Sequence, residues 1–526
     1  MATSESDDVA LASALDDDVP REQERARHHP VPTRAALAVA LLAGVVGYLG
    51  AWRVSLWSDE VATISAAECD PSDLARLLGN IDAVHGLYYG AMHVWITLFG
   101  ASPASIRSSS ALAVAAAAAG VVVLGSRLAD ARTGIVAGVA FALLPRVTWS
   151  AVEARSWAAT LALAVWATVA LHAATEGRRR RWWVLYGGLG ALAVATNIYV
   201  AMLWAAHGLT VVIAARSRER AWVITTAAAA LAAGGVVLVA AGQGGQLGSA
   251  ELTPTRLART IVVNQWFLGE TPTPTTGSGL GLDGWADAWK IAAVALALAA
   301  WGVVTVGIVR GLRSRARLLA WSLPWLIVPT VLVVAAAVVR PSLYNPRYLA
   351  FCAPALALLI GYGLRTLGRT AAVATGVALV LLAVPVYVSQ RGVLSKSSSD
   401  LALAADQLRA RARPGDAIYY GPRDPAVDGL VYRSLRTIGI GYPDAVVGLT
   451  DIALVQSPAA GANLFGTSRD LAASLDGVPE HGTLWVARRE DRPAESEADD
   501  ATLSDAGFAE VSTWHGPQTE IVELRR

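Results

Sequence analysis

The chain has 526 residues, of which 54% are hydrophobic and 16% are charged. A soluble globular domain carries about 25% charged residues, so this composition excludes a chain that is soluble throughout. The formal net charge of +1 gives no reason to expect nucleic-acid binding, which requires a strong excess of positive charge. Only two cysteines occur, Cys69 in a polar loop and Cys352 in an apolar run, so we expect neither a disulfide nor a cysteine metal cluster.

The first 34 residues are polar, with an acidic run at 16–18 and basic residues between Arg21 and Arg34. Such a composition cannot bury a hydrophobic core. A secretory signal would place its charged region nearer the start of the chain. We therefore expect residues 1–34 to form a disordered cytoplasmic tail.

Apolar segments dominate the next part of the chain, and a membrane-spanning helix needs about 20 predominantly apolar residues. Only the short polar break in "TNIYV" separates two of the segments, so the prediction is eleven spans, with ten as the alternative. We expect residues 35–390 to form a multi-pass α-helical membrane domain. The predicted spans lie near residues 35–52, 106–126, 133–150, 157–175, 182–198, 200–215, 221–241, 288–309, 318–339, 348–364 and 371–389.

Arginine residues are distributed unevenly between the loops. With the N-terminus inside, the inner loops read "GSRLADART", "EGRRRRWW", "RSRER", "RGLRSRAR" and "RTLGR". Because Lys and Arg are enriched in cytoplasmic loops, this alternation favours eleven spans over ten. Residues 53–105, residues 242–287, the short loop around Arg340 and everything after about residue 390 are then predicted to be extracytoplasmic.

The region after residue 390 has the pattern of a folded domain. "DLALAADQLRARA" has helical periodicity, and "DDATLSDAGF" reads as a helix with a stop. Strands are predicted at "DAIYY", "DIALVQ", "TLWVARR", "EVSTW" and "TEIVELR". We expect a small extracytoplasmic α/β domain over residues 391–526. The glycines of "GQGGQLG" (242–248) lack the strand–turn–helix context of a phosphate-binding loop.

The loop 53–105 places several polar side chains near the outer membrane surface. Asp59 and Glu60 directly follow the first span. Asp82 and His85 lie between two short segments that we expect to form helices in the interface plane. An acidic helix start is the ordinary explanation for the acid pair, and a lone histidine is more often a packing residue.

Other polar residues are expected at the same level. Glu153 and Arg155 lie in the outer connection "VEARS", and Arg347 follows the ninth span. Glu153 and Arg155 could form a surface pair of little energetic value, and Arg347 could extend to the interface. The coincidence of all these residues on one membrane face favours a functional site.

These motifs, in this order, resemble a known superfamily. An acidic pair after the first span, then "DAVHGLYY", "EARS" and "LYNPRYLAFCAPALALL", is similar to the GT-C polyprenyl-phosphate-sugar-dependent glycosyltransferases. The resemblance is to their bacterial mannosyltransferase branch, related to protein O-mannosyltransferases and lipid A aminoarabinose transferases. It covers roughly residues 50–390. Gly86 follows His85 where relatives often have prolines. The C-terminal domain is a variable addition in such families, so the resemblance implies no function for it.

The resemblance implies a GT-C fold and transfer of a sugar from a polyprenyl-phosphate donor to a hydroxyl group. Mannose is the favoured sugar and arabinofuranose the alternative. The acceptor would be a cell-envelope glycan, a glycolipid or a protein on the outer face. Such a hydroxyl needs a general base, and the resemblance assigns this role to Asp59, with inversion at the anomeric carbon. No cofactor is required, and a divalent metal is not evident.

The resemblance also suggests roles for the remaining candidates. Glu60 would support catalysis or contact the acceptor, and Asp82 and His85 would hold the acceptor or the loop. Arg155 and Arg347 would stabilise the leaving phosphate. Side chains that could stack on the sugar, line the lipid groove or pair with Arg155 are Tyr88, Tyr89, Tyr348 and Glu153.

Two other functions fit a membrane protein of this kind. A transporter or flippase for a lipid-linked sugar would carry charges along its spans, whereas the middles of these spans are nearly free of charge. A non-catalytic assembly protein for an envelope polymer would not need the acid pair. The sequence therefore favours an interfacial enzyme.

Overall fold

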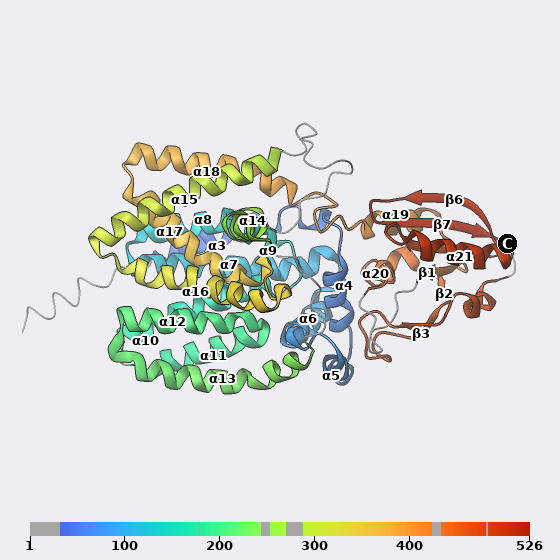
Figure 1. The fold of residues 1–526 in the computed structure, drawn as a ribbon, viewed down its shortest axis with the longest axis horizontal. Helices are drawn as coiled ribbons and strands as arrows, with labels where there is room; N and C mark the ends of the chain where they lie inside the picture. Colours follow the sequence, from blue (N-terminus) through green and yellow to red (C-terminus); the bar gives the residue numbers. More distant parts are fainter. Residues whose placement is uncertain (1–31, 178, 244–252, 270–287, 423–432, 480–481) are drawn as a thin grey trace, which may run out of the picture.

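The computed structural model describes residues 32–177, 179–243, 253–269, 288–422, 433–479 and 482–526 (Figure 1). Long helices run side by side to form a bundle, and the C-terminal region lies beyond one end of it (Figure 1). The first helix, α3, begins at Thr33, so nearly all of the predicted tail, 1–34, falls outside the described residues.

Each predicted span corresponds to a helix or to a bent pair of helices. Among the described residues, eight helices are long and apolar enough to cross a membrane, and the pair α8–α9, bent by 61°, is a ninth candidate. The two remaining predicted spans correspond to shorter helices, α11 with 17 residues and α12 with 14. The multi-pass helical prediction is therefore confirmed. The bundle helices are α3 (Thr33–Tyr48), α7 (Pro103–Leu128), α8 (Ala131–Leu143), α9 (Pro145–Ala151), α10 (Trp157–Glu176), α11 (Arg180–Thr196), α12 (Ala201–Ala214), α13 (Glu219–Gly242), α15 (Ala288–Ser314), α16 (Arg317–Val339), α17 (Ala353–Thr366) and α18 (Arg369–Ser389).

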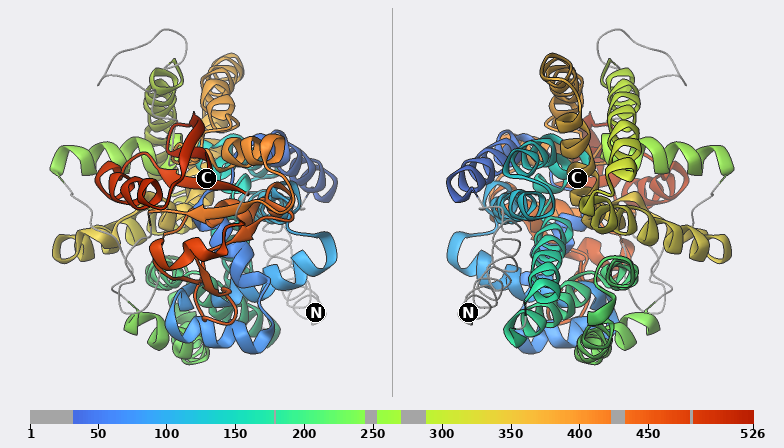
Figure 2. Two further views of the ribbon diagram at one scale, coloured as in Figure 1. Left: turned by 90° about the vertical axis from the view of Figure 1, so that its right-hand side faces the viewer. Right: turned by 90° about the vertical axis from the view of Figure 1, so that its left-hand side faces the viewer.

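Small residues bring the central helices close together. A Cβ atom on Gly125 in α7 would lie 2.8 Å from the Cα of Gly134 in α8, and one on Gly361 in α17 would lie 2.6 Å from the backbone nitrogen of Ala137. Membrane helices associate through close packing because lipid provides no hydrophobic force between them. These glycines therefore fix α7, α8 and α17 as the centre of the bundle, whereas α15 and α18 stand out from it (Figure 2).

Short elements cover the end of the bundle that faces the C-terminal region. The first long loop forms α4 (Ser58–Ala67), α5 (Pro71–Asn80), the 3-10 turn η2 (Ala83–His85) and α6 (Gly86–Phe99). Helix α4 runs across the bundle end (Figure 1). Three further elements are η3 (Ile198–Val200), the π-helix η6 (Thr260–Leu268), which follows α14 (Pro254–Arg259), and η9 (Pro346–Cys352).

The C-terminal region contains a five-stranded sheet in the order β2-β1-β5-β7-β6. Strand β1 is parallel to β2 and β5, and β7 is antiparallel to β5 and β6. The small α/β fold is thus confirmed. The predicted strand "DIALVQ" splits into two, and β3 pairs with β4 in a separate sheet. The elements are α19 (Leu401–Arg411), β1 (Ala417–Tyr420), α20 (Thr437–Gly441), β2 (Thr450–Asp451), β3 (Leu454–Gln456), β4 (Thr467–Ser468), β5 (Thr483–Arg489), α21 (Pro493–Asp505), β6 (Ala509–His515) and β7 (Thr519–Arg525).

The C-terminal region and the first loop share a hydrophobic core. Buried side chains of α4, α5 and α6 pack with those of α19, β1, α20 and β5. The backbone N–H of Leu56 donates to the hydroxyl of Tyr442 at 2.8 Å, and the Ser65 hydroxyl donates to the carbonyl of Leu464 at 2.6 Å. Helix α4, which carries the acid pair, is therefore held between the bundle and the C-terminal region.

Candidate active site

Asp59 lies in the first turn of α4, where a carboxylate is favoured by the helix dipole. Its side chain remains 29% exposed, and its Oδ2 atom lies 3.4 Å from Nη1 of Arg347. A partly exposed carboxylate at this position is accessible to a bound molecule. Asp59 can therefore receive a proton from a bound molecule.

Aromatic rings surround the guanidinium of Arg347. Its Cζ atom lies 5.2 Å from the ring centroid of Trp57, 5.9 Å from that of Trp157 and 5.7 Å from that of Tyr348. Cation–π contacts of this kind orient an arginine. Asn345, just before η9, accepts a hydrogen bond from the backbone N–H of Arg347 at 3.2 Å. These contacts fix a positive charge next to Asp59.

Arg155 lies on another side of Asp59. Its Nη1 donates to the hydroxyl of Tyr89 at 2.9 Å and to the backbone carbonyl of Asp59 at 3.2 Å. The Tyr89 hydroxyl in turn donates to Oδ2 of Asp82 at 2.6 Å. The Nε atom of Arg155 is buried and has no hydrogen-bond partner among the described residues. Because buried donors are almost always satisfied, this N–H is a candidate ligand contact.

The turn between α5 and α6 presents Asp82 and His85 to the same region. Asp82 has a φ of 58°, which Asp tolerates better than most residues. Burial raises the pKa of Asp82, although Arg155 and Tyr89 oppose the shift. Burial, followed by the charges of Arg155 and Arg347, lowers the pKa of His85 well below 6.5. His85 is therefore a neutral hydrogen-bonding group here.

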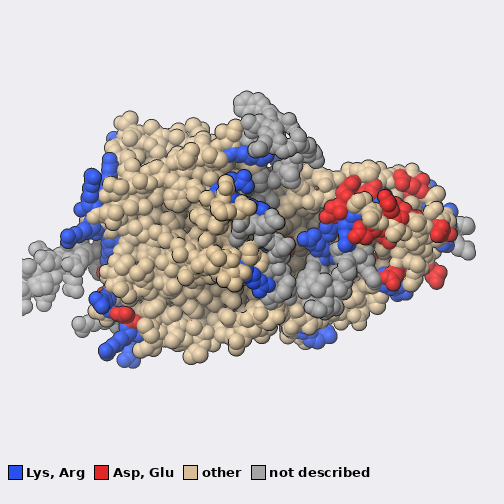
Figure 3. Space-filling model, in the orientation of Figure 1, with Lys and Arg blue, Asp and Glu red and all other residues tan. Residues whose placement is uncertain are grey.

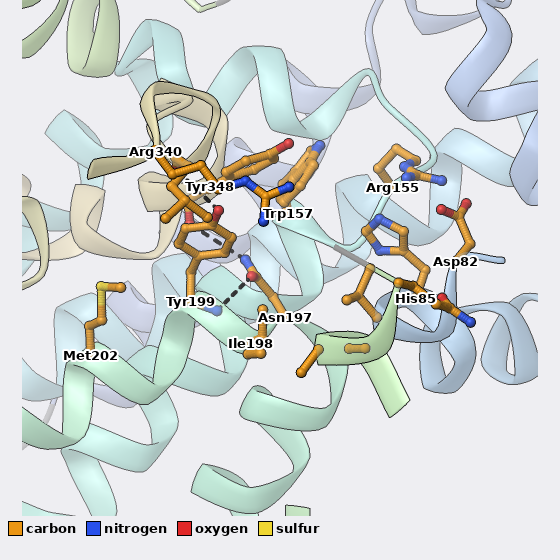
Figure 4. Close-up of a pocket in the computed structure, with 15 residues that line it drawn as sticks. Asp82, His85, Arg155, Trp157, Asn197, Ile198, Tyr199, Met202, Arg340 and Tyr348 are labelled. Atoms are coloured by element: carbon orange, nitrogen blue, oxygen red, sulfur yellow. Dashed lines mark hydrogen bonds between the residues drawn. The ribbon is translucent and has the colours of Figure 1, made fainter. Parts of the chain in front are cut away.

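A cavity of about 440 Å³ adjoins these residues (Figure 4). Asp82, His85 and Arg155 lie at one end of the view, and Arg340, Tyr348 and Tyr199 lie at the other (Figure 4). The remaining lining is mostly apolar and comes from η2, α10, η3, α12, α13 and the loop after α16. The cavity thus joins a polar end at the first loop to an apolar wall of membrane helices. Its lining residues are Asp82, Val84, His85, Arg155, Trp157, Asn197, Ile198, Tyr199, Met202, Ala240, Ala241, Gln243, Arg340, Leu343 and Tyr348.

Several lining residues were not predicted from the sequence. The Tyr199 hydroxyl donates to the carbonyl of Leu343 at 2.9 Å, and its ring centroid lies 4.7 Å from that of Tyr348. The Nδ2 of Asn197 donates to the carbonyl of Tyr348 at 3.5 Å. The polar break "TNIYV" between two apolar runs was the available signal. It marks Asn197 and the 3-10 turn η3, which line the cavity between α11 and α12.

The two neighbouring acids have different surroundings. Glu60 is fully buried and forms an ion pair with Arg107, with Nε–Oε1 and Nη2–Oε2 distances of 2.8 and 2.5 Å. It also accepts the backbone N–H of Ala154 at 2.8 Å. Arg107 donates further to the carbonyls of Ala51 and Val54, both at 2.7 Å. This placement favours a structural role for Glu60 over the predicted contact with substrate.

Glu153 is also enclosed rather than paired with Arg155. Its Oε2 lies 3.2 Å from Nζ of Lys396, and both side chains are buried. The Lys396 ammonium lies 3.9 Å from the ring centroid of Trp149. Lys396 belongs to the segment that joins α18 to the C-terminal region, so this ion pair ties that segment to the "VEARS" connection. Sequence reasoning missed both Arg107 and Lys396 because their partners are distant in the chain.

The structure thus divides the predicted residues into two groups. Asp82, His85, Arg155 and Tyr348 line the cavity, and contacts to these residues place three more beside them: Asp59, Tyr89 and Arg347. Glu60, Tyr88 and Glu153 are buried and do not line it.

Within the described residues, one group has the spacing of a metal site, and it lies elsewhere. Glu490, His515 and Glu520 bring their ligand atoms within 4.8 Å of one another on the C-terminal sheet. Arg488 forms an ion pair with Glu520. That cation competes with any metal for this carboxylate. None of these three residues lines the cavity, so this group does not place a metal there.

The spanning helices, the structured first loop and the cavity at its base define a multi-pass membrane protein of the GT-C fold. ArnT from Cupriavidus metallidurans in the apo state is similar, with 14% identity and a TM-score of 0.51 over 93% of this chain and 97% of that one. ArnT bound to undecaprenyl phosphate matches with 12% identity and a TM-score of 0.51 over 94% and 98% of the two chains.

An oligosaccharyltransferase from Archaeoglobus fulgidus, in the apo form, is similar at a lower level. The identity is 11% and the TM-score 0.48, over 89% of this chain and 70% of that one. No protein-family model and no curated protein sequence matched the chain. At these identities the likeness to ArnT shows the fold, and function rests on the site.

Proposed function

We propose that the protein is a membrane glycosyltransferase that uses a polyprenyl-phosphate sugar as its donor and a hydroxyl group as its acceptor. The observation that carries the proposal is the geometry around Asp59. An accessible carboxylate lies 3.4 Å from Arg347, and Arg155 beside it reaches a cavity with an apolar wall. A base, two cations and a lipid-compatible cavity are what this reaction needs.

The proposed step is an in-line displacement at the anomeric carbon. Asp59 takes the proton of the acceptor hydroxyl while the acceptor oxygen forms a bond to the anomeric carbon. The bond between the anomeric carbon and the phosphate oxygen breaks, and its electron pair leaves with the polyprenyl phosphate. Attack opposite the leaving group inverts the configuration. The products are the glycosylated acceptor, the lipid phosphate and protonated Asp59, which returns its proton to water.

The cations are placed to stabilise the leaving phosphate. Arg347 is fixed by three aromatic rings, and the buried Nε of Arg155 has no hydrogen-bond partner among the described residues. Charge-assisted bonds from arginine to phosphate are among the stronger hydrogen bonds in proteins. The prenyl chain would pass along the apolar wall at Met202 and Leu343. ArnT, which shares the fold, has been solved with undecaprenyl phosphate, and this supports a lipid-phosphate donor.

The direct test is sugar transfer by the purified full chain. Polyprenyl-phosphate mannose and polyprenyl-phosphate arabinofuranose are offered with a panel of glycan, glycolipid and peptide acceptors. Release of the lipid phosphate together with a glycosylated product supports the proposal. Movement of intact donor across a vesicle bilayer without product would support a flippase instead. Donor binding with neither outcome would support an assembly protein.

The catalytic assignment is tested by Asp59→Asn, which keeps the shape and removes the base. Turnover should fall by about two to four orders of magnitude. Donor binding and protein yield should change little, because the side chain is partly exposed. Asp73→Asn is a matched control, since Asp73 lies in α5 of the same loop and pairs with the exposed Arg76. Normal turnover by Asp59→Asn would remove the base assignment.

A further inference from the structure

A second cavity opens at the end of the bundle away from the C-terminal region. It has a volume of about 470 Å³ and lies between α12, the last turn of α15 and the first half of α16. Its walls are aliphatic, with Ile213 from α12, Leu312 from α15 and Ile327 from α16. These three side chains are 58%, 63% and 49% exposed, so the walls are open to the hydrocarbon that surrounds the bundle.

A single charged residue, Arg315, completes the described lining. It forms the tight connection between α15 and α16 and has a φ of 52°, a conformation that normally favours glycine. Its side chain is exposed, and no carboxylate pairs with it in the described part of the chain. Two of the neighbouring cations are engaged: Arg317 pairs with Glu176, and Arg310 donates to the carbonyl of Thr366.

Helix α16 is shaped to keep this cavity open. Pro324, inside the helix, lines the cavity together with Ala320 one turn earlier. Proline has no N–H to donate to the carbonyl of Ala320, and its ring pushes against that turn. The small Ala320 side chain leaves room in the cavity between Arg315 and the aliphatic walls.

We propose that this cavity binds an anionic glycerophospholipid, with its phosphate on Arg315 and one acyl chain in the groove. Lys and Arg gather at this end of the molecule, and the surface between the two ends is largely uncharged (Figure 3). Basic pockets between membrane helices at such an end attract anionic headgroups. A cation at the mouth of an aliphatic groove matches a ligand that has one negative head and an apolar chain. The site is separate from the cavity at Asp59.

Native mass spectrometry of the purified full chain tests this proposal. The protein is titrated with phosphatidylglycerol and with phosphatidylcholine of the same acyl chains. The wild type should hold one phosphatidylglycerol more tightly than phosphatidylcholine. Arg315→Gln should weaken phosphatidylglycerol binding about fivefold, the effect expected from one basic residue near a lipid phosphate. Ala320→Phe, which fills the groove, should weaken binding of both lipids.

Matched variants separate a built site from general attraction. Arg313→Gln removes a charge from the same helix end, and Ala335→Phe adds the same bulk on an exposed part of α16; neither residue lines the cavity. Both controls should bind as the wild type does. Equal loss in Arg313→Gln and Arg315→Gln, or equal affinity for the two lipids, would overturn the proposal. If Ala320→Phe does not fold, Ile213→Trp fills the groove from an exposed position, and unchanged binding would again overturn it.

Discussion

At the scale of single residues, Asp59 and Glu60 show how neighbours in one helical turn take different roles. Glu60 is fully buried against Arg107, whereas the side chain of Asp59 is 29% exposed and meets Arg347. A fully buried carboxylate that is enclosed by its ion-pair partner cannot contact a substrate. A partly exposed carboxylate beside a cavity can do so. The acid pair thus consists of one residue suited to chemistry and one suited to holding α4 in place.

Arg347 should contribute to donor binding through both charge and stacking. Arg347→Gln should raise the donor KM by about 10- to 100-fold, which is the scale of a hydrogen bond to a charged group. Arg347→Lys should restore only part of the donor affinity, since lysine lacks the planar group that packs between Trp57 and Trp157. Initial-rate kinetics over a range of donor concentrations measures the effect. Arg53→Gln, which changes an exposed arginine at the start of the first loop, should have normal kinetics. An unchanged KM in Arg347→Gln would place the phosphate elsewhere.

His85 should make stability depend on pH. In the folded protein its pKa is held well below 6.5 by burial and by Arg155 and Arg347. In the unfolded chain it takes up a proton near pH 6.5. Below that pH the unfolded state binds more protons, so acidification lowers the free energy of unfolding, by up to about 1.4 kcal/mol per pH unit. Above pH 6.5, His85 does not make the free energy of unfolding depend on pH.

Thermal unfolding between pH 7 and pH 5 checks this prediction. The wild type should lose more apparent stability over this range than His85→Gln, which has no proton to gain. His93→Gln, in α6, serves as the comparison. Parallel pH profiles for the wild type and His85→Gln would show that His85 titrates normally in the folded state.

At the scale of elements, α4 is stabilised from two sides. Every residue from Glu60 to Ala67 is buried, with the bundle on one side and the C-terminal region on the other. The Glu60–Arg107 pair joins α4 to α7, and Arg107 also donates to the backbone carbonyls of Ala51 and Val54. The position of Asp59 therefore depends on a buried ion pair as well as on apolar packing.

Glu60→Gln should consequently damage folding more than chemistry. Removing one partner of a buried ion pair costs about 3–5 kcal/mol, because the other charge stays buried without compensation. We expect a lower melting temperature and a lower yield than for Asp59→Asn. Glu68→Gln, at the exposed end of α4, should resemble the wild type. A stable Glu60→Gln protein that has lost only turnover would instead assign Glu60 a direct catalytic role.

Local sequence patterns predicted most helices and strands, but they did not predict the side-chain pairings between distant residues. Apolar length indicated the spans, and the runs "TLWVARR" and "TEIVELR" indicated β5 and β7. The bend between α8 and α9 comes at Pro145, a signal that was present but not used. Arg107 stood inside the start of an apolar span, where a charge usually marks a specific partner. Its partner Glu60 and the pairing of Lys396 with Glu153 depend on the tertiary arrangement, so sequence spacing could not give them.

At the scale of the whole molecule, two features indicate the membrane topology. They are the distribution of Lys and Arg and the core that the first loop shares with the C-terminal region. Lys and Arg gather at the bundle end away from the C-terminal region (Figure 3). That is the end expected in the cytoplasm. The loop after α3 and the C-terminal region share a core and must therefore lie on the same side of the membrane. An even number of spans then separates them, which agrees with eleven spans in total and disagrees with ten.

The two ends of the chain should accordingly lie on opposite sides of the membrane. A reporter that is active only in the cytoplasm should be silent when fused after Arg526 and active when fused before Met1. The physical reason is the shared core: the backbone N–H of Leu56, just after the first span, donates to the hydroxyl of Tyr442 in the C-terminal region at 2.8 Å, and groups in contact must lie on the same side of the membrane. A fusion after Arg315, at the arginine-rich end, supplies a positive control for cytoplasmic activity. Activity of the Arg526 fusion equal to that control would mean that one predicted span does not cross, and it would separate the C-terminal region from the loop that carries Asp59.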